Sequence, residues 1–291
     1  MKQTFSLFLL CSLFYCQGLA QKKEMLQAET RPFVLGHVME ISSKELNEKR
    51  TLNIYLPEGY DAKDSLRYPV VYLLDGSADE DFIHIVGLYQ FNNFPWIDRV
   101  PKSIIVGIAN TDRKRDFTYP TSIALDKKEL PTTGGSKNFI AFLEKELQPF
   151  IQSRYKTNSS KTIIGQSLGG LLATEILLKK TTLFSQYIII SPSLWWDNGS
   201  LLALSSNMLT DTFTQKTQVY IGVGKEGLTP GQTNRVMEVD ANLLAEKLKA
   251  GKSKSVHIYF DYLPAEDHAT ITHQAVFNAL RLLNPDKQSN P

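Results

Sequence analysis

Short apolar runs recur along the chain from residue 33 onward, with polar segments between them. The run at 50–57 (RTLNIYLP) alternates apolar and polar residues, as a strand with one buried face does. Later runs are apolar without alternation, which is typical of strands buried on both faces of a parallel sheet. These continuous runs are 69–76, 103–110, 161–167, 186–193, 218–224 and 255–264. The pattern predicts a mostly parallel sheet, preceded by an antiparallel hairpin built from 33–42 and 50–57.

Amphipathic segments lie between these strand candidates. Residues 136–153 place their apolar side chains along one stripe, and helices are also expected over 168–180, 236–250 and 268–283. Strands that alternate with helices predict an α/β fold with a mostly parallel central sheet, helices on both faces and the antiparallel hairpin at one edge. Two stretches, 78–100 and 111–135, are longer than ordinary connections, and insertions of this kind usually shape a site.

The first residues have the pattern of a secretory signal peptide. Lys2 precedes the apolar run 5–15, and the small residues Gly18 and Ala20 lead into a polar segment. Cleavage after Ala20 is expected, which makes 1–20 the leader and 21–31 a linker. A lipoprotein anchored through Cys16 is the less favoured alternative, because the bulky Tyr15 precedes that cysteine. We therefore expect a secreted or periplasmic protein without stable membrane association.

Composition narrows the possible partners. The chain has 291 residues, of which 42% are apolar, so one large domain over 32–285 with a short tail at 286–291 is expected. The formal charge is only +2, and no basic run with interleaved aromatic residues occurs, which argues against nucleic acid as a partner. Both cysteines, Cys11 and Cys16, lie in the leader, so no thiolate metal site is expected. The oligomeric state cannot be read from these features.

One motif carries chemistry. The sequence Gly165-Gln-Ser-Leu-Gly169 joins a strand candidate to a helix candidate, and Gly170 follows it. A G-x-S-x-G turn between a strand and a helix exposes its serine at the positive end of the helix. Ser167 is therefore the candidate nucleophile; a buried structural serine in a glycine-rich turn is the alternative.

A serine nucleophile needs a histidine base and an orienting acid, in the chain order Ser, acid, His. Among five histidines, His268 follows the last strand directly and is the candidate base, with His273 as the alternative. Glu226 follows the next-to-last strand and is the favoured acid. Asp197 is the alternative acid, and a Ser–His pair without a strong acid also stays open.

Two backbone amides are expected to stabilise an oxyanion. The amide of Leu168, directly after the nucleophile, is one of them. The second should come from the loop after the 69–76 strand, where the amide of Gly76 or Ser77 is the candidate. Asp75 is expected to hold this loop together.

The chain resembles the putative esterase (esterase D-like) branch of the α/β-hydrolases. The resemblance rests on GQSLGG and on YPVVYLLDG, IIVGIANTDRKRDFTYP, SPSLWWD and AEDHATITHQAVFNAL, and it spans about residues 33–283. Within that branch it is most similar to bacterial siderophore esterases of the enterobactin and bacillibactin type. The resemblance implies an α/β-hydrolase fold, Ser167 as nucleophile and His268 as base, and in that subgroup the acid is variable. The branch also holds acyl-sugar and feruloyl esterases and acyltransferases.

Four further residues are candidates for substrate binding. Arg113 and Arg115 follow the 103–110 strand and could hold an anionic oxygen; a loop-anchoring ion pair with Asp112 or Asp116 is the alternative. Trp195 and Trp196 could form an aromatic wall, or one of them could pack in the core.

Together these features predict an exported serine ester hydrolase that acts on a small-molecule ester without metal or cofactor. An acyltransferase and a catalytically silent binding protein are the alternatives.

Overall fold

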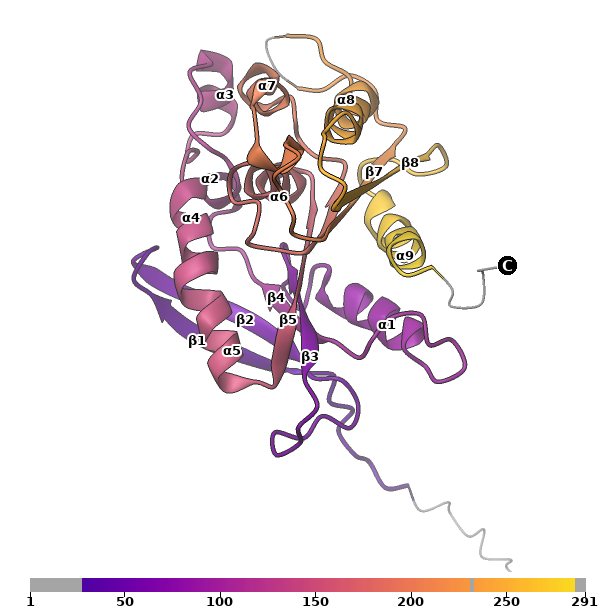
Figure 1. Cartoon of the computed structure of the whole chain (residues 1–291). Helices are drawn as coiled ribbons and strands as arrows, with labels where there is room; N and C mark the ends of the chain where they lie inside the picture. Colours follow the sequence, from indigo (N-terminus) through magenta and orange to yellow (C-terminus); the bar gives the residue numbers. More distant parts are fainter. Residues whose placement is uncertain (1–27, 231–232, 286–291) are drawn as a thin grey trace, which may run out of the picture. The chain divides into compact units, whose positions relative to one another are not determined.

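The strand candidates form one eight-stranded sheet with the order β1-β2-β4-β3-β5-β6-β7-β8 (Figure 1). The computed structural model describes residues 28–230 and 233–285, and the expected leader at 1–20 and tail at 286–291 lie outside them. The compact unit begins at Leu35. The strands are β1 (His37–Ser43), β2 (Glu48–Tyr55), β3 (Tyr68–Leu73), β4 (Ile104–Ile108), β5 (Thr157–Gln166), β6 (Gln186–Ile190), β7 (Thr217–Gly224) and β8 (Val256–Leu263).

The strand directions agree with the prediction from the sequence. β1 pairs antiparallel with β2, and β2 pairs antiparallel with β4. All other neighbours, from β4–β3 to β7–β8, run parallel. The mostly parallel sheet with an antiparallel N-terminal pair at its edge is thus confirmed. The carboxyl ends of the parallel strands meet at one edge of the sheet, where ligands bind in folds of this kind.

Helices cover both faces of the sheet, each over its own apolar cluster. α1 and α9 pack on one face and contact each other, while α4, α5, α6 and α8 pack on the opposite face. The helices are α1 (Phe82–Asn92), α2 (Arg113–Phe117), α3 (Ala124–Glu129), α4 (Ser136–Phe142), α5 (Gln148–Arg154), α6 (Leu168–Lys179), α7 (Ser200–Ala203), α8 (Met237–Lys249) and α9 (Ile271–Leu283). A π-helical turn, η1 (Leu143–Leu147), joins α4 to α5, and η2 (Trp196–Gly199) and η3 (Asn207–Leu209) are short 3₁₀ turns.

The helix expected over 136–153 is continuous but widens in the middle. Pro149 lies in the first turn of α5 and has no N–H group, so it cannot donate to the carbonyl of Lys145. The π-helical turn η1 lies directly before this proline and accommodates the missing hydrogen bond.

The insertion 78–100 contains a helix that the periodicity did not reveal. α1 buries one face, with Ile85, Val86 and Tyr89 among its buried side chains, but the apolar residues Ile83 and Phe91 lie exposed on the rest of its surface. A helix that also has apolar residues on its exposed side has no clear polar stripe to mark its period. The insertion 111–135 likewise contains α2 and α3.

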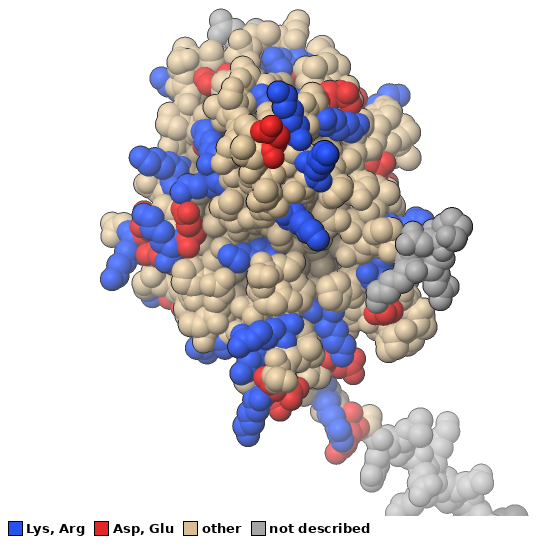
Figure 2. Space-filling model, in the orientation of Figure 1, with Lys and Arg blue, Asp and Glu red and all other residues tan. Residues whose placement is uncertain are grey.

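Charge is dispersed over the surface. On the face seen in Figure 2, Lys and Arg side chains are separated by acidic and uncharged residues. Within the described ranges, each helix is too short or too polar to cross a lipid bilayer.

The junction between β5 and α6 leaves no room for a side chain at Gly165. A Cβ atom built on Gly165 would lie 2.4 Å from the carbonyl oxygen of Gly169, far inside van der Waals contact. Gly165 is therefore required by the close approach of strand and helix. By contrast, a Cβ atom on Gly87, in the middle of α1, would meet nothing within 4 Å.

These two glycines make a matched pair for substitution. We expect Gly165→Ala to lower the free energy of unfolding by about 1–3 kcal/mol, because the added methyl group forces the backbone apart. Gly87→Ala should raise it by about 0.5–1 kcal/mol, because alanine loses less conformational entropy in a helix. Urea denaturation of both variants measures the difference, and equal stabilities would contradict the crowding at Gly165.

Candidate active site

Ser167 lies in a strained turn between β5 and α6. Its backbone angles are φ 59° and ψ −119°, a region that residues with a Cβ atom rarely adopt. Its amide donates to the carbonyl of Ile190 at 3.0 Å, and its carbonyl accepts from the amides of Leu171 and Ser193. These bonds tie the turn to the end of β6 and hold the hydroxyl at the N-terminus of α6.

His268 lies in the turn directly before α9, with its side chain half exposed. Its Nε2 atom lies 3.0 Å from Ser167 Oγ. The turn is capped by Asp267, whose carboxylate accepts from the amides of Ala269 and Thr270. The Gln166 side chain also donates to the His268 carbonyl at 2.9 Å, so the strand that carries the serine holds the histidine as well. The structure thus brings His268 to Ser167, whereas His273 packs its ring 6.0 Å from that of His84.

Glu226 follows β7 and meets the other side of the same imidazole. Its Oε2 lies 2.5 Å from His268 Nδ1, and its side chain is only 3% exposed. Its Oε1 accepts from the hydroxyl of Ser191 and, at 3.2 Å, from the amide of Gly224. Burial raises the pKa of Glu226, but the hydrogen bonds from His268 and Ser191 outweigh burial, so the net pKa lies below its ordinary value. The carboxylate is therefore ionised at neutral pH.

A second carboxylate holds the backbone of this loop. Glu238, in the first turn of α8, accepts from the amides of Glu226 at 2.9 Å and of Gly227 at 3.0 Å. The sequence did not single out Glu238 or Ser191. Ser191 opens the SPSLWWD motif, but the motif does not reveal that its hydroxyl meets Glu226. Ser191, Glu226 and Glu238 lie in three separate segments of the chain. Their contacts can be recognised only once the fold has brought these segments together.

Asp197, the alternative acid, is occupied elsewhere. Its Oδ1 accepts from the Thr121 hydroxyl at 2.8 Å and from the Ser122 amide at 3.2 Å. It thereby ties the left-handed turn at 197–199 to the 111–135 insertion. The hypothesis that Asp197 orients the base is corrected by this placement.

The two candidates for the second oxyanion donor differ in their hydrogen bonds. The Gly76 amide donates to the carbonyl of Ile108 at 3.0 Å and so is not available, which corrects that half of the expectation. In the described part of the chain, the amides of Ser77 and Leu168 donate to no protein acceptor. These two remain the candidate pair.

Asp75 and Arg113 hold the Ser77 loop beside the nucleophile. The Arg113 guanidinium binds both carboxylate oxygens of Asp75, at 2.6 and 2.9 Å, and donates to the Gln166 carbonyl at 3.1 Å. Asn110 also donates to Asp75. Asp75 therefore holds its loop together, as the sequence suggested. Arg113 uses Asp75, rather than Asp112 or Asp116, as its partner. The charge of Asp75 adds to burial in raising the pKa of Asp81 to about 6.

Two of the other candidate substrate residues have structural roles. Arg115 binds Asp116 at 2.8 Å and Glu48 at 2.7 Å, which is the ion-pair alternative. Trp196 is fully buried and donates its indole N–H to the Tyr119 carbonyl, so it belongs to the core. Trp195 is partly exposed and packs edge-on against Trp196.

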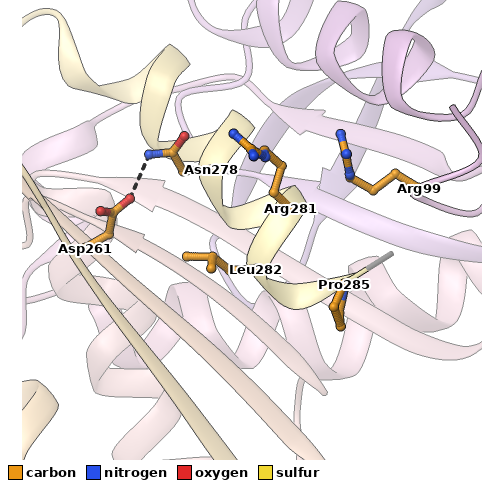
Figure 3. Close-up of a pocket in the computed structure, with 6 residues that line it drawn as sticks. All are labelled: Arg99, Asp261, Asn278, Arg281, Leu282 and Pro285. Atoms are coloured by element: carbon orange, nitrogen blue, oxygen red, sulfur yellow. Dashed lines mark hydrogen bonds between the residues drawn. The ribbon is translucent and has the colours of Figure 1, made fainter. Parts of the chain in front are cut away.

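A separate hollow of about 450 Å³ lies near the C-terminal end of α9 (Figure 3). It is lined by Arg99, Asp261, Asn278, Arg281, Leu282 and Pro285. Asn278 donates to Asp261 within it, and none of these side chains is a nucleophile. Ser167, His268 and Glu226 are not among the residues that line this hollow.

The chain is similar to known proteins over most of its length. Residues 43–276 match the model of the family described as Putative esterase. The chain belongs to this family. It is accordingly a carboxylic ester hydrolase of the serine type with an α/β-hydrolase fold.

Characterised relatives of this esterase include siderophore esterases. It is 30% identical over 258 residues to the ferri-bacillibactin esterase BesA of Bacillus subtilis (strain 168), covering 82% of this chain and 87% of that protein. An IroE-like serine hydrolase from Shewanella oneidensis has a TM-score of 0.76 at 34% identity, covering 86% of this chain and 80% of that one. The BES protein from Bacillus cereus has a TM-score of 0.71 at 28% identity, covering 90% and 99%.

The two acid candidates can be separated by isosteric amides. We expect Glu226→Gln to lower kcat roughly 10²–10⁴-fold, because an amide cannot stabilise the imidazolium that forms on His268. Asp197→Asn should change kcat by less than about threefold, since its partners are a hydroxyl and an amide. Hydrolysis of p-nitrophenyl butyrate by the purified variants measures both. A larger loss in Asp197→Asn would reverse the assignment.

Proposed function

We propose that this protein is an exported serine esterase that hydrolyses siderophore-type esters through an acyl-enzyme on Ser167. The observation that carries the proposal is the position of the His268 ring. One of its nitrogens lies 2.5 Å from Glu226 and the other 3.0 Å from Ser167 Oγ. Nucleophile, base and acid thus stand in hydrogen-bonding sequence, as acyl transfer requires.

In the first half of the reaction, Ser167 Oγ attacks the acyl carbon of the ester while its proton passes to His268 Nε2. The carbonyl oxygen becomes an oxyanion, which the amides of Leu168 and Ser77 are positioned to receive. Glu226 stabilises the positively charged imidazole. The carbon–oxygen bond to the alcohol then breaks, and His268 returns the proton to the departing alcohol.

In the second half, water takes the place of the alcohol. His268 accepts a proton from the water molecule that attacks the acyl carbon. The bond between the acyl carbon and Ser167 Oγ then breaks, His268 returns the proton to Oγ, and the carboxylic acid leaves. Because both halves use the same three side chains, removal of any one should impair the whole cycle.

The substrate class is inferred from two supports. Several relatives are named as siderophore esterases, among them the ferri-bacillibactin esterase. Partly exposed Trp195, at the same edge of the sheet, offers an aromatic surface for an aryl acyl group.

Substitution of the nucleophile tests the chemistry and a substrate panel tests the class. The panel contains p-nitrophenyl butyrate, an acetylated xylan, a feruloyl ester and a ferric catecholate trilactone. Ser167→Ala should fold normally and lose at least about a thousandfold in turnover. The wild-type protein should turn over the trilactone with the highest kcat/KM. Full activity in Ser167→Ala would contradict the mechanism, whereas preference for the xylan or feruloyl ester would contradict only the substrate class. Acyl transfer to added glycerol in place of hydrolysis would indicate an acyltransferase.

The mass of the mature protein tests the proposed cleavage of the leader. The pattern of residues 1–20 supports cleavage after Ala20, so the protein recovered from outside the cytoplasm should begin at Gln21. Intact-mass spectrometry distinguishes this product from an uncleaved chain and from a chain that begins at a lipid-modified Cys16. Either of the latter two would contradict the proposed processing.

A further inference from the structure

Ser191 occupies an unusual backbone position at the end of β6. The strand ends at Ile190, and the next residue has φ 42°, in the left-handed region that favours glycine. Ser191 is fully buried, and its amide donates to the Gly222 carbonyl on β7 at 2.8 Å. Glycine would adopt this backbone conformation with less strain. The presence of a buried serine here therefore indicates that its side chain has a role.

That side chain reaches the carboxylate of Glu226. The Ser191 hydroxyl donates to Oε1, while His268 contacts Oε2. The side chain of Ser191 thereby joins the end of β6 to the loop that follows β7. The strained backbone at Ser191 thus occurs together with a hydrogen bond from its hydroxyl to Glu226.

The two oxygens of Glu226 are therefore not equivalent. With Oε1 bound by Ser191 and by the Gly224 amide, Oε2 is the oxygen that faces the imidazole. Among the described residues, two titratable groups bond to Glu226: the His268 ring, through Oε2, and the carboxylate of Glu238 on α8, which binds the Glu226 amide. Lys225, next in the chain, is exposed. Because the carboxylate is 3% exposed, its ionised form depends on hydrogen bonds rather than on water.

We propose that Ser191 is a positioning residue of this esterase, which holds Glu226 ionised and in the rotamer that meets His268. This role rests on the proposed function of Ser167, His268 and Glu226. Ser191 acts through Glu226 and does not itself contact the substrate. Without its hydroxyl, the buried carboxylate loses a donor and directs more of its charge at the imidazole. The pH at which the pair formed by Glu226 and His268 gains a proton should therefore rise.

Two substitutions separate the hydroxyl from the backbone. Ser191→Ala removes the hydroxyl and keeps the strained backbone, while Ser191→Gly removes the hydroxyl and relieves the strain. Ser136→Ala is the matched control, because Ser136 is also a fully buried serine and its hydroxyl makes no hydrogen bond within the described residues. Two readouts are used across pH: kcat/KM for p-nitrophenyl butyrate, and the rate of covalent labelling of Ser167 by a fluorophosphonate.

We expect both Ser191 variants to lose about tenfold in both rates at neutral pH and to shift the acidic limb of the profile to higher pH. Ser191→Gly should unfold at the same or a higher temperature than Ser191→Ala, and Ser136→Ala should match the wild type. In a Glu226→Gln background, Ser191→Ala should cause no further loss, because the hydroxyl acts through the carboxylate.

Other results would overturn the role of Ser191. They are wild-type rates in Ser191→Gly, an unshifted acidic limb in both variants, or the same tenfold loss in the Glu226→Gln background. If the alanine variant does not fold, the glycine variant decides alone. A wild-type protein whose Ser167 reacts with neither reagent would instead contradict the proposed function.

Discussion

The crowded turn at Ser167 is the constraint on which the rest of the site depends. Strand and helix approach so closely at Gly165 and Gly169 that the residue between them is forced into a left-handed backbone. Its hydrogen bonds to Ile190 and Ser193 then tie β5 to the end of β6. Ser191 lies between Ile190 and Ser193. The strained backbone at Ser167 and the strained backbone at Ser191 therefore adjoin each other at the end of β6.

Polar side chains link the loops around this turn. Arg113 joins Asp75 to the Gln166 carbonyl, so the Ser77 loop and the nucleophile are linked by a single guanidinium. Bidentate pairs of this kind fix orientation as well as distance, which a flexible lysine would not. On the other side, Gln166 donates to the His268 carbonyl. The residue before the nucleophile thus holds both neighbouring loops, one with its backbone and one with its side chain.

Local patterns predicted much of the fold and the reactive centre. The continuous apolar runs revealed the parallel strands, and the G-x-S-x-G turn with the chain order Ser, acid, His selected Ser167, Glu226 and His268. The sequence favoured Glu226 but did not exclude Asp197, because both follow strands and only the fold reveals which carboxylate meets the imidazole. Arg113 was marked as a candidate, but its partners Asp75 and Gln166, like the contacts of Ser191 and Glu238, join distant segments that no local pattern connects. The sequence pattern did not predict α1, because apolar residues on its exposed side leave no clear polar stripe.

The spacing of the three reactive residues along the chain sets when activity can begin. Ser167 and His268 are 101 positions apart, and Glu226 and His268 are 42 apart. His268 comes after β8, the last strand of the sheet, and its turn leads into the helix α9 that closes one face. A growing polypeptide that has already formed the serine turn therefore still lacks its base. With the proposed assignment of nucleophile, base and acid, the catalytic arrangement is complete only after β8 and the turn before α9 have been synthesised and have docked on the sheet.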